Sequence, residues 1–293
     1  MDLRKRDILA LGMGLAGAAL AQPAPAPRAR RRSAPVPHRL AKTTPLFRSP
    51  PGYPNAIAVA PEGLWIAEQK LSGPSARQYG LPDPADLREA AWLTDWNGKL
   101  LKTVWTQSRN TSGMAYGGGF IWMCANQPPE GIFQTDLNGN TISHRQIPLG
   151  PPDNGGGCHG AMWHDGKLWI ASLRLHGILR VDPASWAPEF LIPVNLPANQ
   201  SRLHGIAWDQ GAIWIVTGNE DSTSFATGKP GLAKYDAATG VLLETVEFVP
   251  GSSDPHGLAM HDGVMISCDA GIHPGWPNND SPTSGFVFRI DFI

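Results

Sequence analysis

The sequence predicts an all-β protein, a five-bladed β-propeller whose N-terminal strand closes the last blade. Three observations predict it: residues that favour helices are sparse, 33 Gly and 28 Pro interrupt many short apolar runs, and one unit recurs along the chain. Short apolar runs separated by turns are typical of all-β folds. With 293 residues, 42% of them hydrophobic, the chain can form one large core. Its formal net charge of −1 does not indicate a nucleic-acid partner.

The N-terminal segment has the pattern of an export signal. Arg4, Lys5 and Arg6 precede an apolar run over residues 8–21, so we predict that residues 1–21 are a signal peptide. Lys5 and Arg6 make it similar to a twin-arginine signal, with the general secretory route and an uncleaved anchor as alternatives. Because the apolar run is short for a transmembrane span, we expect a periplasmic or secreted protein with no stable membrane span after cleavage.

The next segment, residues 22–42, is rich in Pro, Ala and Arg and shows no apolar periodicity. It cannot bury enough apolar surface to fold alone, which predicts a disordered tether. A basic patch for phospholipid or nucleic acid is the alternative. Residues 43–293 are then predicted to form a single propeller domain.

The repeat unit begins with a short strand, continues after a Gly-containing turn with a second strand, and has a third strand that ends in Asp. Its openings recur every 45 to 57 residues, which is the spacing of four-stranded propeller blades. They place five residues at equivalent positions: Asn55, Ser112, His159, His204 and His256.

The last unit offers no fourth strand before Ile293. Phe47 precedes Asn55 by eight residues, as Phe248 precedes His256, so the segment from Lys42 to Pro50 is predicted to supply that strand. Such closure would cover sheet edges that are otherwise free to aggregate. A sixth, degenerate blade is the main alternative.

Six tryptophans also recur at fixed positions of the unit. We expect all of them to pack between adjacent blades rather than to bind a ligand. Four lie in second strands and two in first strands: Trp65, Trp122, Trp169 and Trp214, and Trp163 and Trp208.

Polar side chains are predicted to converge at one mouth of the central channel, where first strands begin and second strands end. Three neighbouring imidazoles, His159, His204 and His256, could share a zinc, copper or iron ion and leave a coordination position open for water or substrate. The alternative is that these histidines are structural. The residues that follow the second strands form the other half of the site: Glu68, Gln69, Asn126, Arg174, Asn219, Asp269 and His273.

Roles within this site follow from side-chain chemistry. Glu68 or Asp269 would serve as the base, and Arg174 could hold an anionic group of the substrate. His164 and His261 precede Asp-Gly turns, so we expect them at the opposite end of the channel, in structural roles.

The chain has three cysteines, of which at least one must be unpaired. Cys124 and Cys158 could form a disulfide, and a copper site that includes a thiolate is the alternative. Cys268 is the third.

Several units of the chain resemble the repeats of virginiamycin B lyase, gluconolactonase-like and NHL-repeat propellers. Examples are His204-Gly205-Ile206-Ala207-Trp208 and Gly63-Leu64-Trp65-Ile66-Ala67-Glu68. The resemblance covers nearly all of residues 43–293 and implies the propeller fold more specifically than an activity. In the lyase, channel-face His and Glu residues with a divalent metal open a cyclic ester by elimination, and the resemblance implies His204, His256 and Glu68 as the matching residues. Plant-type glutaminyl cyclotransferases are similar in blade number, although their sequence signatures are not evident here.

Together these features predict a periplasmic metal-dependent hydrolase or lyase that acts on a small ester or lactone-like molecule at the channel mouth. The alternative is a non-catalytic propeller that binds a ligand or protein partner through its loop-rich face. The long insertions at residues 221–229 and 272–283 would form that surface.

Overall fold

The structure is a computed structural model that describes residues 35–293, except 79, 150–156, 220–221, 270, 272–274 and 277–283. From Val36 to Ile293 the chain forms one compact unit. The predicted signal peptide lies outside the described residues, as does most of the predicted tether. In the described ranges, no helix has both the length and the apolar character needed to cross a membrane.

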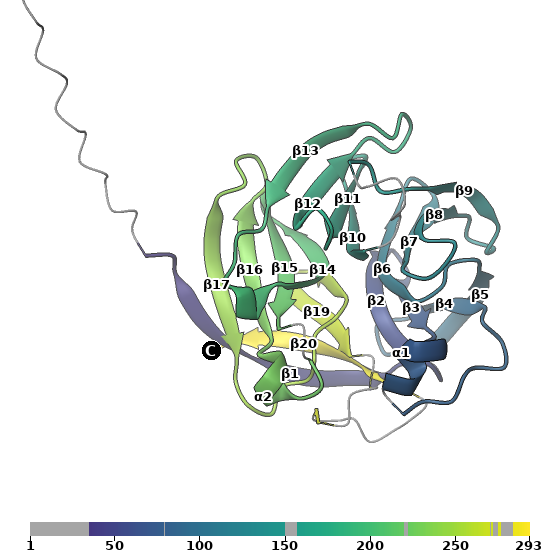
Figure 1. The fold of residues 1–293 in the computed structure, drawn as a ribbon, viewed down its shortest axis with the longest axis horizontal. Helices are drawn as coiled ribbons and strands as arrows, with labels where there is room; N and C mark the ends of the chain where they lie inside the picture. The colour runs from purple at the N-terminus through teal and green to yellow at the C-terminus, as the bar shows by residue number, and fades with distance from the viewer. Residues whose placement is uncertain are drawn as a thin grey trace, which may run out of the picture. The chain divides into compact units, whose positions relative to one another are not determined.

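The fold is all-β and repeats one four-stranded unit, as the sequence predicts. Inner strands begin at the predicted repeat openings and are followed by antiparallel second and third strands. Figure 1 shows β2, β6, β10 and β14 on the inside and β5, β9, β13 and β17 on the outside. The inner strands are β2 (Tyr53–Ala60), β6 (Thr111–Gly117), β10 (Cys158–His164), β14 (Arg202–Asp209) and β18 (Leu258–His261).

The strands that follow them in each unit match the predicted order. Second strands are β3 (Gly63–Gln69), β7 (Phe120–Ala125), β11 (Lys167–Ser172), β15 (Ala212–Gly218) and β19 (Val264–Asp269). Third strands are β4 (Glu89–Thr94), β8 (Gly131–Thr135), β12 (Gly177–Val181), β16 (Gly231–Asp236) and β20 (Phe286–Phe292). Outer strands are β5 (Leu100–Thr106), β9 (Thr141–Arg145), β13 (Pro188–Pro193), β17 (Leu242–Phe248) and β1 (His38–Arg48). Short helices are α1 (Gly73–Gln78), α2 (Phe225–Gly228) and the 3-10 helix Ala198–Gln200.

The Asp residues that end third strands fix the turns to the outer strands. Asp136 accepts hydrogen bonds from the backbone N–H groups of Asn138 and Asn140, and Asp236 accepts them from Ala238 and Thr239. These carboxylates satisfy turn amides that have no partner in the sheet.

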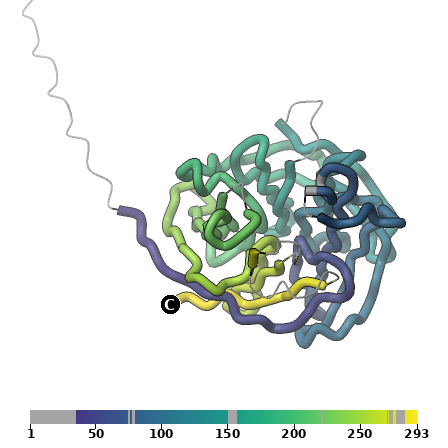
Figure 2. The backbone as a smooth tube through the Cα atoms, turned by 60° about the horizontal axis from the view of Figure 1, so that its bottom comes forward, coloured from purple at the N-terminus to yellow at the C-terminus, as the bar shows by residue number. Residues whose placement is uncertain are grey.

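The N-terminal strand β1 closes the last unit, as predicted. It pairs antiparallel with β20, with Ala41 opposite Phe292 and Arg48 opposite Phe286. Its first residues also pair in parallel with the outer strand β17, which joins two four-stranded units into one eight-stranded sheet. Figure 2 shows the purple strand running beside the yellow C-terminal strand. The tether predicted for residues 22–42 overlaps this strand, because β1 begins at His38. Residues 38–42 are ordered by their pairing with β17 and β20.

Apolar clusters between neighbouring units hold the ring together. One cluster joins Ile57, Ile66 and Trp92 of the first unit to Ile266 and Val287 of the last, so the ring is closed. The four second-strand tryptophans are at most 3% exposed and lie in such clusters, as predicted: Trp65, Trp122, Trp169 and Trp214. For Trp163 and Trp208 the prediction is only partly right, because both remain half-buried and line a cavity at the end of the channel.

Candidate functional site

The predicted arc of histidines exists. The ring centroids of His159 and His204 are 4.8 Å apart, and those of His204 and His256 are 4.7 Å apart. Each imidazole comes from the start of its unit, where the inner strands converge. The following glycines allow this convergence, because a Cβ on Gly160 would lie 2.4 Å from the carbonyl oxygen of His204.

A buried cation that the sequence analysis did not identify lies beside the arc. Arg202 is 5% exposed, donates to Asp254 Oδ1 at 2.9 Å and faces Nε2 of His256 at 3.3 Å. Arg202 and Asp254 occupy equivalent positions of successive units, two residues before His204 and His256. An alignment of the repeats two residues before the histidines shows a cation in one unit and an anion in the next, which could have revealed this ion pair.

The electrostatic environment keeps His159 neutral. Burial, and after it the charge of Arg202, lowers the pKa of His159 to about 4. Its Nδ1 is buried without a hydrogen-bond partner in the part of the chain that the structure describes, and the same holds for Oδ1 of Asn55. Buried polar atoms without partners cost free energy, so this channel mouth can accept a polar ligand or water.

A shared metal ion does not fit the three histidines as they lie. Across the described ranges, no group of three His, Cys, Asp or Glu side chains is arranged to hold a metal ion. Nδ1 of His256 faces the carbonyl oxygen of Asp254 at 3.2 Å, while Nε2 faces Arg202. A guanidinium only donates and a carbonyl only accepts, so His256 carries its proton on Nδ1 and its Nε2 lone pair is engaged. Since a metal ion there would have to displace a buried cation, the predicted zinc, copper or iron site is not supported.

The two predicted bases have different surroundings. Asp269 is 5% exposed, and its oxygens accept hydrogen bonds from the backbone N–H groups of Gly271 and Asp254. Burial, and after it the charge of Asp254, raises the pKa of Asp269 to about 7. Because backbone amides occupy both oxygens, this carboxyl group fixes a loop rather than facing a substrate.

Glu68, the other predicted base, lines a cavity of 330 Å³ of its own, whose walls do not include the histidines. Its Oε2 accepts the N–H of Ala90 at 2.9 Å and lies 3.8 Å from Nζ of Lys70. Its Oε1 faces Gly52, where a Cβ would lie 2.9 Å away. Burial raises the pKa of Glu68, although Ala90 and Lys70 oppose the shift. The walls are mostly apolar: Pro51, Gly52, Tyr53, Leu71, Leu81, Pro82 and Pro84, together with Lys70.

Lys70 is held in place beside this carboxylate. Its ammonium donates to the carbonyl oxygens of Asp86 and Arg88 at 3.2 and 2.6 Å. These residues belong to the segment between β3 and β4 that also contains α1. The insertion therefore builds the wall of the Glu68 cavity and fixes its cation.

Most other predicted site residues have structural contacts. Arg174 lies along Gly157 and pairs with Glu130 at 3.5 Å. Ser112 Oγ donates to the carbonyl oxygen of Asn110 at 3.4 Å. The backbone N–H of Asn219 donates to the carbonyl oxygen of Gly228, and the side-chain amide of Gln69 donates to Oδ1 of Asn110. His273 lies outside the described residues.

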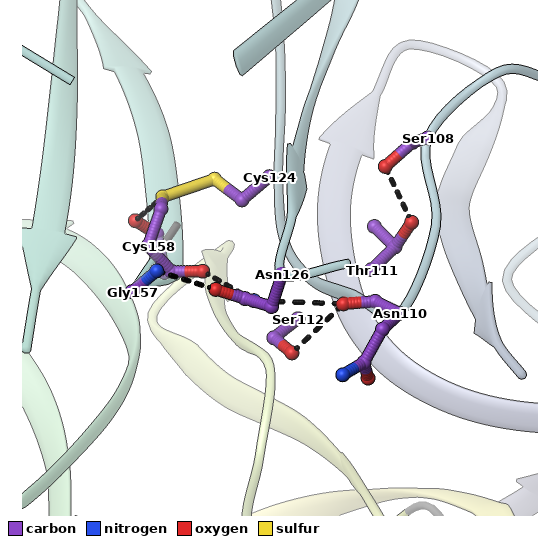
Figure 3. Close-up of a disulfide and its surroundings, with 9 residues drawn as sticks. Ser108, Asn110, Thr111, Ser112, Cys124, Asn126, Gly157 and Cys158 are labelled. Atoms are coloured by element: carbon purple, nitrogen blue, oxygen red, sulfur yellow. Dashed lines mark hydrogen bonds between the residues drawn. A yellow bond between two sulfur atoms is a disulfide. The ribbon is translucent and has the colours of Figure 1, made fainter. Parts of the chain in front are cut away.

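Cys124 and Cys158 form a disulfide, one of the two alternatives that the sequence left open. It joins β7 to β10, and Asn126 bridges the same two units by donating to the carbonyl oxygen of Cys158 and accepting from the N–H of Gly157 (Figure 3). Cys268 is buried and unpaired. The inner strand that carries His159 is thus fixed covalently to the neighbouring unit.

Comparison with known proteins bears on the fold alone. No protein-family model matches this sequence, and no curated protein matches it. A crystal structure of Myxococcus xanthus glutaminyl cyclase aligns over 89% of this chain and 100% of its own, with a TM-score of 0.53 and 12% identity. Virginiamycin B lyase from Staphylococcus aureus aligns over 82% of this chain and 66% of its own, with a TM-score of 0.45 and 16% identity, which is too loose to support an argument. The chain therefore has a β-propeller fold similar to that of the glutaminyl cyclase.

Proposed function

We propose that this protein is a hydrolase or lyase that acts on a small ester or lactone-like molecule, with Glu68 as its general base. The observation that carries the proposal is a buried carboxylate with a raised pKa and one oxygen facing an apolar cavity. Such groups are characteristic of acid–base sites. In hydrolysis, Glu68 would take a proton from water as the water oxygen attacks the carbonyl carbon. The acyl C–O bond would then break, and Glu68 would return the proton to the leaving alkoxide oxygen. Leu71 and Leu81 would contact an apolar acyl group.

The test is hydrolysis of p-nitrophenyl butyrate and δ-valerolactone by wild type, Glu68→Gln and the control Glu62→Gln. Glu62 is an exposed carboxylate just before the same strand. We expect Glu68→Gln to lower kcat/KM by roughly 10²- to 10⁴-fold and the control to leave it unchanged. Wild-type kcat/KM should rise with pH through an apparent pKa above the ordinary value for Glu and then level off, because the base acts when deprotonated. No turnover of either compound, or equal turnover by Glu68→Gln, would reject the proposal.

A second candidate is the binding of a partner through the loop face. The two insertions predicted to form that face contact each other: Phe225 lies edge-on to Trp276, with ring centroids 5.7 Å apart, and Trp276 Nε1 donates to the carbonyl oxygen of Ser222. A cavity of 580 Å³ adjoins them, lined in part by Phe225 and Lys229. If alanine at Phe225 and Lys229 abolishes capture of a periplasmic protein that Glu68→Gln still captures, the binding function is favoured.

We also propose a count of five blades, with the eight-stranded sheet counted as two. In the strand order of that sheet, as far as the structure describes it, the two halves meet at the parallel pairing of the outer strands β17 and β1. Apolar clusters between neighbouring units support this count. A crystal structure with another sheet in the ring would contradict it.

Export to the periplasm is the last part of the proposal. It is supported by the charged and apolar pattern of residues 1–21 and by the Cys124–Cys158 disulfide, a bond typical of oxidising compartments. Fractionation of cells that express the full chain should give a periplasmic protein whose mature N-terminus lies at about residue 22. Retention of the intact chain in the cytoplasm would count against export.

A further inference from the structure

A second cavity lies at the opposite end of the channel from the histidines. Its volume is 280 Å³, and the second halves of the inner strands line it. Between the two ends the inner strands come so close that the gap around Gly113, Gly160, Gly205 and Gly257 has no room for a water molecule. The cavity is therefore closed off from the histidine mouth and needs its own explanation.

The cavity has a small apolar floor and an aromatic rim. One equivalent position of the units carries four alanines and one methionine, all at most 8% exposed: Ala58, Ala115, Met162, Ala207 and Ala259. The next position of each inner strand is half-buried and carries Val59, Tyr116, Trp163, Trp208 and Met260. Small residues below large ones leave a bowl that is open to solvent.

The walls of this bowl are rigid. The turns after β10, β14 and β18 contain two residues with positive φ, such as 49° at Asp165 and 71° at Gly166, which defines the tight type I′ hairpin. His164 stacks on Trp208 with ring centroids 3.6 Å apart, and Trp163 stacks on Trp122 at 5.8 Å. A Cβ on Gly117 would lie 2.0 Å from Trp163, so the backbone covers that indole closely. A preformed site of this kind loses little conformational entropy on binding.

The chemistry of the lining selects an uncharged ligand. Among the described residues, no Asp, Glu, Lys or Arg lines the cavity. Burial lowers the pKa of His164, which favours its neutral form. The Tyr116 hydroxyl and the indole N–H groups of Trp163 and Trp208 make no hydrogen bond to another residue that the structure describes. The lining of the bowl thus combines apolar side chains with polar area, and these donors belong to residues that form it.

We propose that this bowl binds a small, flat, uncharged aromatic molecule that carries a hydrogen-bond acceptor. The ring would lie on the floor formed by the alanines and Met162, between the aromatic walls, and its acceptor would take a hydrogen bond from Tyr116 or an indole N–H. This site is separate from the Glu68 cavity and does not depend on the function proposed for it.

Calorimetric titration of the full-length protein with quinoline at a pH where quinoline is uncharged tests the proposal. We expect a Kd below about 1 mM and at least tenfold weaker binding by Met260→Trp, which adds bulk at the rim. Leu243→Trp, at a 38% exposed position of β17, is the matched control and should bind as wild type does. If Met260→Trp does not fold, Tyr116→Ala replaces it and should also weaken binding.

Three results would overturn the proposal: no binding of quinoline, equal binding by the rim variant, or tighter binding of phenyltrimethylammonium than of quinoline. The last would identify a cation-binding aromatic cage instead. Ester hydrolysis should be the same in Met260→Trp and wild type, so failure of one proposal is distinguishable from failure of the other.

Discussion

At the scale of single residues, two buried glutamates of the first unit differ in the number of donors that surround them. Glu89 is 0% exposed and accepts hydrogen bonds from the N–H groups of Lys70, Asn110 and Thr111 and from the Thr111 hydroxyl. These bonds oppose the burial that raises the pKa of Glu89 to about 8. Glu68 accepts one backbone N–H and faces a cavity. The first carboxyl group holds two units together, and the second is available for chemistry.

We predict that Glu89→Gln destabilises the fold. Every group around Glu89 is a donor, so the amide NH₂ of Gln would face a donor and leave a buried group unpaired, at a cost of about 1–3 kcal/mol. Denaturant unfolding at about pH 9, above the pKa of about 8 and therefore with Glu89 ionised, measures this loss. The exposed control Glu62→Gln should change the free energy of unfolding by less than about 0.5 kcal/mol, and equal stability of the two variants would contradict the role given to Glu89.

At the scale of elements, β1 is the strand on which ring closure depends. Ala41 is fully buried between β17 and β20, whereas Leu46 of the same strand is 45% exposed. A single strand thus has one position that tests closure and another that serves as its control.

Ala41→Glu should destabilise the protein by about 2–5 kcal/mol, because it buries an unpaired charge where two sheets join. Leu46→Glu adds the same charge at a solvent-exposed position and should have little effect. Thermal unfolding compares them. If Ala41→Glu matches the control, β1 does not close the ring in solution.

The disulfide is the second element that connects neighbouring units. It links residues 34 apart in sequence, and bonds of this kind typically contribute about 2–4 kcal/mol. We predict that dithiothreitol lowers the Tm of wild type and not that of a Cys124→Ala, Cys158→Ala double variant. The third cysteine, Cys268, should not contribute to this change in Tm, because burial raises its pKa and keeps the thiol unreactive. A Tm that dithiothreitol leaves unchanged in wild type would mean that the bond does not form.

At the scale of the whole molecule, buried carboxyl groups make stability depend on pH. The pKa of Asp269 is raised to about 7 from an ordinary 3.8, so the folded state binds a proton that the unfolded state has released. This contribution is fully present below pH 3.8 and is lost as pH rises through about 7.

We therefore predict that the free energy of unfolding falls between about pH 4 and pH 7, by up to about 4 kcal/mol from Asp269. Urea unfolding over this range gives the slope. Asp269→Asn should make the slope shallower, because the amide does not titrate. Glu89, whose pKa is raised to about 8, keeps part of the slope, and His159, whose pKa is lowered to about 4, opposes it. An unchanged slope in the variant would assign the pH dependence to other groups.

The sequence by itself determined the all-β class, the repeating unit, the strand that closes the ring and the arc of three histidines. These features are periodic, and period, turn residues and strand length are local properties that a sequence displays directly. The burial of Trp65 and its three equivalents followed from the same periodicity, as did the places of His164 and His261 at the ends of β10 and β18.

The tertiary structure alone decided what those side chains face. Arg202 lies next to His256, where a metal ion shared by the three imidazoles would have to displace it. Backbone amides donate to Asp269, and Glu68 lines a cavity whose wall is built in part by an insertion outside the repeat. The tertiary structure also left Trp163 and Trp208 half-buried, packed against the core clusters on one side and lining the bowl on the other. The physical reason is that burial, charge and hydrogen-bond partners come from neighbouring units and loops, whose contacts the period of the repeat does not specify.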